Sequence, residues 1–170
     1  MALDPNTTVR IDGAKIILRN FAGKEGPMNA PGDRNFCVLI SDPKLADDLV
    51  RDGWPLRPAK EFEDGEIRDP FIAVKLGYKG RPPHVVMLSS RGRTDLTEDE
   101  VEMLDWLEFA NVDLIFRPYN WNVGLKAGVK AYLKSMYVTV VEDELDLKYA
   151  HVPDANENKF GPGNPPGEED

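Results

Sequence analysis

The residues best suited to chemistry lie close together in residues 115–137, which read IFRPYNWNVGLKAGVKAYLKSMY. The four cations of this segment, Arg117, Lys126, Lys130 and Lys134, occur without any acid, and tyrosine and tryptophan residues lie between them. Cations on one surface neutralise successive phosphates, and exposed aromatic rings stack on nucleobases. The composition of this segment therefore predicts a surface that holds a polyanionic strand.

Residues 129–134 alternate between apolar and polar side chains, as in a strand with one buried face. Lys130, Tyr132 and Lys134 are then expected on the outer face, with successive side chains about 7 Å apart. This spacing is similar to that of phosphates along a single strand, and the tyrosine is placed to stack on a base. The alternative interpretation is an ordinary solvated strand face.

Two large rings, Tyr119 and Trp121, fall among asparagines and glycines that are typical of an exposed loop. Pro118 is expected to end the preceding strand and to stiffen this loop. An exposed ring indicates a binding role, whereas the alternative is that Trp121 plugs one end of the fold. Arg117 and Tyr119 remain candidates under both interpretations.

Further cations are expected in loops at the ends of neighbouring strands. Lys79 and Arg81 occur in GYKGRPP, and Arg91 and Arg93 occur in SSRGRT. The complete set of residues predicted to bind nucleic acid is Arg91, Arg93, Arg117, Tyr119, Trp121, Lys126, Lys130, Tyr132 and Lys134.

Residues that could carry catalysis are sparse. His84 and His151 are the only histidines, and with Cys37 they are too few and too far apart in the sequence for a zinc site. Neither a phosphate-binding P-loop nor a GxGxxG motif is present. A metal-dependent nuclease is the alternative enzyme, but no acid lies two residues before Lys75 as a restriction-type pattern requires. We therefore expect no enzymatic activity, no metal and no cofactor.

The acidity of the chain is concentrated at its C-terminal end. Residues 142–170 contain nine acids against two lysines, and so carry seven of the nine formal negative charges. Residues 1–150 are expected to form one domain, and residues 151–170 a disordered tail, because they contain too little apolar surface to offset their ordering entropy. The tail either solubilises the protein or competes with nucleic acid and contacts partner proteins.

Strands dominate the expected secondary structure. They are expected at residues 8–21 with a bend at Gly13, 34–41, 54–58 at a sheet edge, 70–78, 84–90, 112–117 and 129–141, with helices at 43–52 and 98–109. Strands 70–78 and 84–90 are expected to pair antiparallel with each other, and a loop is expected to join the last two strands. This pattern is typical of a mainly β protein built as a small barrel, with an open sandwich as the alternative.

Three segments, DRNFCVLI (33–40), NVDLIFRPYNWNV (111–123) and GVKAYLKSMYVTV (128–140), together with the acidic C-terminus, carry a family resemblance. The chain resembles single-stranded DNA-binding proteins of tailed bacteriophages over most of residues 9–150. The resemblance implies a five-stranded OB-type β-barrel with two short helices, and sequence-tolerant binding of single-stranded DNA in phage replication and recombination. It also implies an acidic tail that contacts replication proteins. The chain departs from related proteins in ending on Glu168, Glu169 and Asp170 rather than on an aromatic residue.

The class of partner follows from these expectations. We expect single-stranded DNA as the ligand, no membrane association, since no run of 18 apolar residues and no signal peptide is present, and hence a cytoplasmic location in the host cell. A homo-oligomer is compatible with the sequence. The alternative function is a virion, scaffold or protein-interaction β-domain that does not bind nucleic acid.

Overall fold

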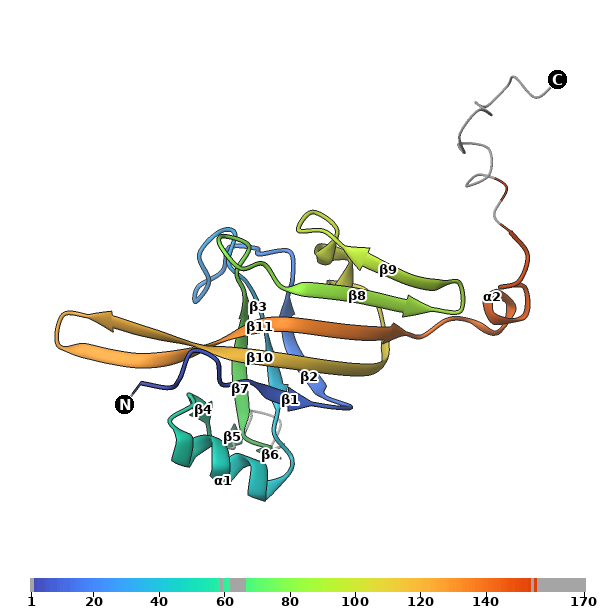
Figure 1. Ribbon diagram of the computed structural model, residues 1–170. Helices are drawn as coiled ribbons and strands as arrows, with labels where there is room; N and C mark the ends of the chain where they lie inside the picture. Colours follow the sequence, from blue (N-terminus) through green and yellow to red (C-terminus); the bar gives the residue numbers. More distant parts are fainter. Residues whose placement is uncertain (1, 59, 62–66, 154, 156–170) are drawn as a thin grey trace.

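The main sheet closes into a barrel (Figure 1). The computed structural model describes residues 2–58, 60–61, 67–153 and 155. The barrel strands are β1 (Val9–Ile11), β2 (Lys15–Asn20), β3 (Arg34–Leu39), β7 (Phe71–Leu76), β10 (Phe109–Val123) and β11 (Lys126–Val140). They are hydrogen-bonded in the order β1–β10–β11–β7–β3–β2, and β7 with β11 is the parallel pair of this path.

The barrel closes because β1 and β2 are successive parts of one bent strand. Gly13 lies between them with φ +63°, a conformation that glycine adopts without steric cost. The bend is fixed to β10 from both sides, since Gly13 N donates to Asp113 Oδ1 at 2.9 Å and Ala14 N donates to the Val112 carbonyl at 2.8 Å. The prediction of a five-stranded OB-type barrel, with a first strand bent at Gly13, is confirmed.

The barrel interior is apolar and follows the alternation of the strands. Val129, Ala131 and Leu133 of β11 point inward, as predicted, and are buried with Phe36 and Phe116. Trp54 packs edge-on against Phe116 with ring centroids 4.9 Å apart. Cys37 is also buried, and burial raises the pKa of its thiol.

One predicted helix is confirmed and the other is wrong. α1 (Pro43–Asp52) begins where Asp42 accepts a hydrogen bond from Lys44 N and ends at Gly53, which has φ +96°. In place of a helix over 98–109 there is one 3₁₀ turn, η1 (Val101–Asp105). Just before this turn, Thr97 N donates a hydrogen bond to Glu100 Oε1 at 2.9 Å.

The early end of this helix has a local cause in its contacts with β2. Arg19 Nη1 donates to the carbonyls of Leu104 and Leu107, and the Asp105 carboxylate accepts from Phe21 N and Ala22 N. These bonds hold the turn against the end of β2, so that β10 begins at residue 109. A short helix that the sequence analysis did not predict, α2 (Glu144–Lys148), follows β11.

The pairing predicted between strands 70–78 and 84–90 is wrong. β7 and β8 (His84–Ser89) both lie parallel to β11, β7 beside Ala131 and Tyr132 and β8 beside residues 135–139. They fit one after the other because β11 is 15 residues long. β8 instead pairs antiparallel with β9 (Gly92–Leu96), where the sequence predicted a turn.

Smaller elements complete the sheet. β4 (Leu56–Arg57) pairs with β7 at the predicted edge, and β5 (Lys60–Glu61) pairs with β6 (Ile67–Arg68). No described helix is both long enough and apolar enough to cross a membrane. The predicted tail, residues 151–170, lies outside the described residues except for 151–153 and 155.

The predicted loop between residues 117 and 129 is also wrong, because these residues form a β-hairpin. β10 continues through Pro118 to Val123, the chain turns at Gly124 with φ +61°, and β11 begins at Lys126. Pro118 is tolerated because β10 pairs there with β11 alone, the pairing with β1 having ended at Phe116. We call residues 117–130 the arm, which extends beyond the barrel (Figure 1).

Candidate nucleic-acid interface

The outer face of β10 and β11 gathers the cations and rings that the sequence singled out. Tyr119 is paired with Lys130 across the two strands, and Arg117 is paired with Tyr132. Directly opposite residues share a face of the sheet, so these four side chains form one cluster on the side away from the core. The predicted outer face of residues 129–134 is therefore confirmed.

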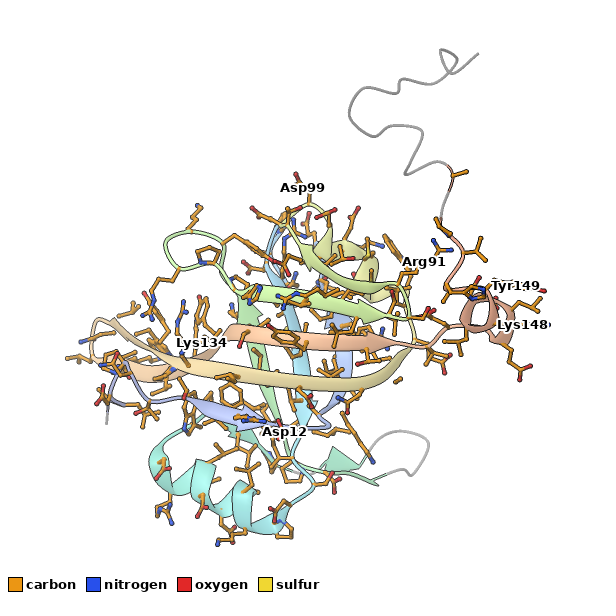
Figure 2. All side chains as sticks on the ribbon, turned by 45° about the vertical axis from the view of Figure 1, so that its right-hand side comes forward. Asp12, Arg91, Asp99, Lys134, Lys148 and Tyr149 are labelled. Carbon is orange, nitrogen blue, oxygen red and sulfur yellow. The ribbon has the colours of Figure 1, made fainter. Side chains whose placement is uncertain are left out.

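A β-bulge at Lys134 limits this cluster. Ile115 pairs with Ser135 and Phe116 with Leu133, so Lys134 is the extra residue of β11. Before the bulge Val129, Ala131 and Leu133 of β11 are buried, and after it Met136 and Val138 are buried. A bulge shifts the alternation by one residue. Lys134 is exposed at this change of face, on the middle part of β11 (Figure 2).

Tyr132 is held at the centre of the cluster by a glycine. A Cβ atom added at Gly77 would lie 2.8 Å from Cε2 of Tyr132, so the tyrosine ring lies directly over this backbone. The Tyr119 ring lies 5.4 Å from the Tyr132 ring between centroids, at an angle of 58°. Burial raises the pKa of Tyr132, and so do nearby Tyr119 and Asp33. The ring therefore stays uncharged at neutral pH.

A groove of about 530 Å³ opens beside these two rings. Its walls carry Lys79, Arg81 and Arg117, together with Tyr119 and Tyr132, and no carboxylate from the described residues lines it. Three cations without an acid between them create a positive potential, which attracts an anionic ligand. The neighbouring rings offer flat apolar surfaces at the same place.

Arg117 is the best-positioned cation of the groove. Its Nη2 donates to the carbonyl of Arg81 at 3.1 Å, which fixes the guanidinium beside the loop after β7. Burial lowers the pKa of Arg117, and the charge of Arg81 lowers it further. An anion bound between Arg81 and Arg117 would be attracted by both guanidinium groups and would reduce the repulsion between them.

A second hollow of about 480 Å³ adjoins the groove on the other side of Tyr132. Both hollows are lined by Gly77, Lys79 and Tyr132, so the tyrosine stands between them. Lys75 and Arg34 add positive charge to the second hollow, while Asp33 and Glu98 offset part of it, with Glu98 lying 3.8 Å from Arg34. The two hollows therefore meet at Tyr132.

The arm carries the remaining predicted ring. Trp121 lies over Gly128, where an added Cβ atom would approach the indole to 2.7 Å. The indole is half-buried and lies outside the barrel core, so the interpretation of Trp121 as a plug is wrong. Lys126 and Lys130 are exposed on the same arm.

Arg91 and Arg93 lie apart from this cluster, near the end of β8. Arg93 stands 5.6 Å from the Tyr137 ring and forms an ion pair with Asp95 at 3.2 Å. Arg91 lies beside Glu142, whose pKa is lowered chiefly by hydrogen bonds from Ser90 and also by the charge of Arg91. Figure 2 places Arg91 toward the end of the molecule that holds Lys148 and Tyr149. Nearby carboxylates thus offset the positive charge in this region.

The sequence analysis undervalued two groove residues and missed a third. The sequence analysis named Lys79 and Arg81 as cations in a loop but did not include them among the binding residues. It did not name Gly77, whose backbone lies beneath Tyr132. The available signal was their position directly after a strand in a Gly- and Pro-rich turn, where side chains gather at a barrel end. Within the described ranges, no three His, Cys, Asp or Glu residues are grouped so as to hold a metal ion.

Comparisons with known proteins agree with this geometry. The family described as "Putative phage ssDNA-binding domain" matches residues 3–165. The single-stranded DNA-binding protein from bacteriophage Enc34 in complex with ssDNA has a similar structure, with a TM-score of 0.52, 13% identity, and coverage of 80% of this chain and 88% of that chain. A second structure of the single-stranded DNA-binding protein from bacteriophage Enc34 gives a TM-score of 0.50 at 13% identity, with coverage of 80% of this chain and 82% of that chain. At this identity the likeness establishes a shared fold. No curated protein matches the sequence.

Proposed function

This chain belongs to the phage single-stranded-DNA-binding domain family, and from that premise we propose that it binds single-stranded DNA with little sequence preference and without catalysis. The observation that carries the proposal is the groove that holds Lys79, Arg81 and Arg117 with Tyr119 and Tyr132 and is lined by no described carboxylate. Cations along a backbone and rings beneath the bases are the two components of such binding.

Each component has a distinct role. Arg117 and Arg81 bind phosphates in the groove, and Lys79 continues the positive surface toward the second hollow. Tyr132 and Tyr119 stack on bases, a contact that tolerates every base because every base has a flat face. Arg81 and Arg117 orient the strand so that its bases meet the rings.

The arm lengthens the binding surface. Trp121 offers a further stacking surface over Gly128, and Lys126 and Lys130 lie within the same hairpin. Lys134 continues the positive charge along β11, while Arg93 and Arg91, with nearby carboxylates, serve as peripheral contacts. The protein thereby protects single-stranded DNA during phage replication and recombination, and its acidic C-terminal residues contact replication proteins. Self-association into a homo-oligomer belongs to the same proposal.

The first test is fluorescence anisotropy of the full chain with labelled oligo-dT, a mixed single strand and a duplex, across a salt series. We expect tight binding that favours both single strands equally, with a log–log salt slope of about −0.7 for each phosphate neutralised. Absence of binding to either strand at low salt would contradict the proposal and favour a scaffold or assembly role.

A variant locates the site. We expect Tyr132→Ala to weaken binding of both single strands by about 1–3 kcal/mol, because one base loses its stacking partner. Tyr149→Ala is the matched control, since Tyr149 is a half-exposed tyrosine beyond β11, away from the groove. A folded Tyr132→Ala protein that binds like the wild type would show that the stacking assignment is wrong.

A further inference from the structure

The tip of the arm exposes apolar side chains at the turn of a narrow hairpin. Leu125 has a relative exposure of 106%, and Val123 has one of 72%. Gly124 makes the turn between them with φ +61°, and Lys126 follows directly. Leu125 and Val123 thus form an apolar tip at the end of the arm that is open to contact with a ligand.

The construction of the arm makes this tip a slender projection. Beyond Phe116, β10 pairs with β11 alone, and before Ala131, β11 pairs with β10 alone. Two paired strands are about 5 Å apart between backbones. The base of the arm is fixed by Leu3, whose N–H donates to Asn120 Oδ1 at 2.9 Å and whose carbonyl accepts from Asn120 Nδ2 at 2.8 Å.

The charge of the arm indicates what covers its tip. No acid occurs between Leu114 and Ser135, whereas Arg117, Lys126, Lys130 and Lys134 all do. A basic hairpin without acids suits a polyanion, and Val123 lies on the same face of β10 as Tyr119 and Trp121, the rings proposed to stack on bases. We therefore favour nucleic-acid bases over a protein surface as the occupant.

We propose that the arm tip is a wedge that opens duplex DNA at its ends, with Leu125 and Val123 inserted against the terminal base pair. The proposal rests on the proposed binding of single-stranded DNA, and adds strand opening to it. When a terminal pair frays, Leu125 occupies the freed space and its apolar surface leaves water. Lys126 binds the adjacent phosphate, and the freed strand passes along Trp121 toward the groove.

The experiment separates opening from binding. A DNA hairpin with a fluorophore and a quencher on its two ends reports opening by stopped flow at saturating full-length protein, and anisotropy with oligo-dT reports single-strand affinity. For Leu125→Ser we expect the hairpin to open about tenfold more slowly. The serine buries less apolar surface in the opened state, and this loss of stabilisation slows the opening step. The oligo-dT affinity of this variant should equal that of the wild type.

The control variant is Leu145→Ser, which makes the same change at an exposed leucine of α2, and it should open the hairpin at the wild-type rate. Thermal unfolding verifies that both variants are folded, and Val123→Ser provides a second, independent change at the tip.

Three results would overturn the wedge. One is an opening rate for Leu125→Ser equal to that of the wild type. Another is an oligo-dT affinity that falls by the same factor as the rate, because the tip would then only extend the binding surface. The third is a wild-type protein that binds oligo-dT but leaves the hairpin closed. A wild-type protein that fails to bind oligo-dT at all would instead contradict the proposed function itself.

Discussion

At the scale of single residues, two rings of the interface lie over glycines. Tyr132 covers Gly77 and Trp121 covers Gly128, and in both cases an added Cβ atom would come within 3 Å of the ring. Only a residue without a side chain leaves room for a ring this close to the backbone. If these rings stack on bases as proposed, glycine at these positions helps to orient them.

Gly77→Ala tests this arrangement. The new methyl group would meet Cε2 of Tyr132 at 2.8 Å, and the ring would have to move because it is the side chain that can yield. We expect weaker binding of oligo-dT, by about 1–2 kcal/mol as for a partly lost stacking contact, with little change in the midpoint of thermal unfolding.

The matched control is Gly26→Ala, because no atom lies within 4 Å of a Cβ added there and Gly26 does not have a positive φ. Gly77→Ala protein with wild-type affinity would show that the position of the Tyr132 ring does not matter for binding.

At the scale of elements, the sequence predicted best what depends on local pattern. The bend at Gly13, the helix over 43–52 and the outer face of residues 129–134 follow from one glycine, a capped helix and a period of two. The pairing between strands that are distant in the sequence was harder to predict. Nothing in residues 70–90 shows that β7 and β8 both align with β11, since that depends on the length of β11, which lies much later in the chain at residues 126–140.

Pro118 illustrates a different limit. A proline lacks the N–H that a central strand requires, and the sequence analysis therefore ended the strand there. The structure continues because this part of β10 has one neighbour rather than two. The groove was hard to predict for a related reason, since Lys79 and Arg81 meet Arg117 only because β7 and β10 both pair with β11. By contrast, the family resemblance in residues 33–40, 111–123 and 128–140 is confirmed by the match over 3–165.

Asn120 provides a test at this scale, because its side chain makes both hydrogen bonds that join the arm to the N-terminal segment. We expect Asn120→Ala to lower the free energy of unfolding by about 1–2 kcal/mol, since two partly buried backbone groups of Leu3 lose their partners. Hydrogen exchange at the amides of residues 117–123 should become faster.

Asn122→Ala is the control, since Asn122 is an exposed residue of the same hairpin. Equal unfolding free energies and equal exchange rates for the two variants would show that the contact with Leu3 does not hold the arm in place.

At the scale of the whole molecule, positive and negative charge are separated along the chain. The cations of the arm and groove lie in residues 79–130, whereas residues 142–170 carry nine acids. Glu142 accepts hydrogen bonds from Ser90 N and Ser90 Oγ at 2.5 Å each, which fixes the start of the acidic segment to the turn between β8 and β9. The acidic segment thus begins at the opposite end of β11 from the arm (Figure 1).

Deleting residues 153–170 removes five acids and one lysine. We expect tighter binding of oligo-dT at low salt, because the remaining protein repels phosphates less, and a difference that disappears at high salt through screening. The midpoint of thermal unfolding should stay the same, as the barrel strands and their core all precede residue 142.

A full-length variant with these five acids changed to Asn or Gln separates charge from chain length, and should match the deletion. If neither variant differs from the wild type at any salt concentration, the acidic residues have no electrostatic effect on binding.

The closure of the barrel through β1 also has a consequence for biosynthesis. Val9 pairs with Phe116 and Ile11 with Leu114, so the first strand waits for a partner made more than 100 residues later. At translation rates of about 5–20 residues per second, this interval lasts roughly 5–20 s. Throughout it, one edge of the nascent sheet has no partner strand, and folding dominated by such distant contacts is slow. The barrel therefore cannot be completed until β10 and β11 have been synthesised.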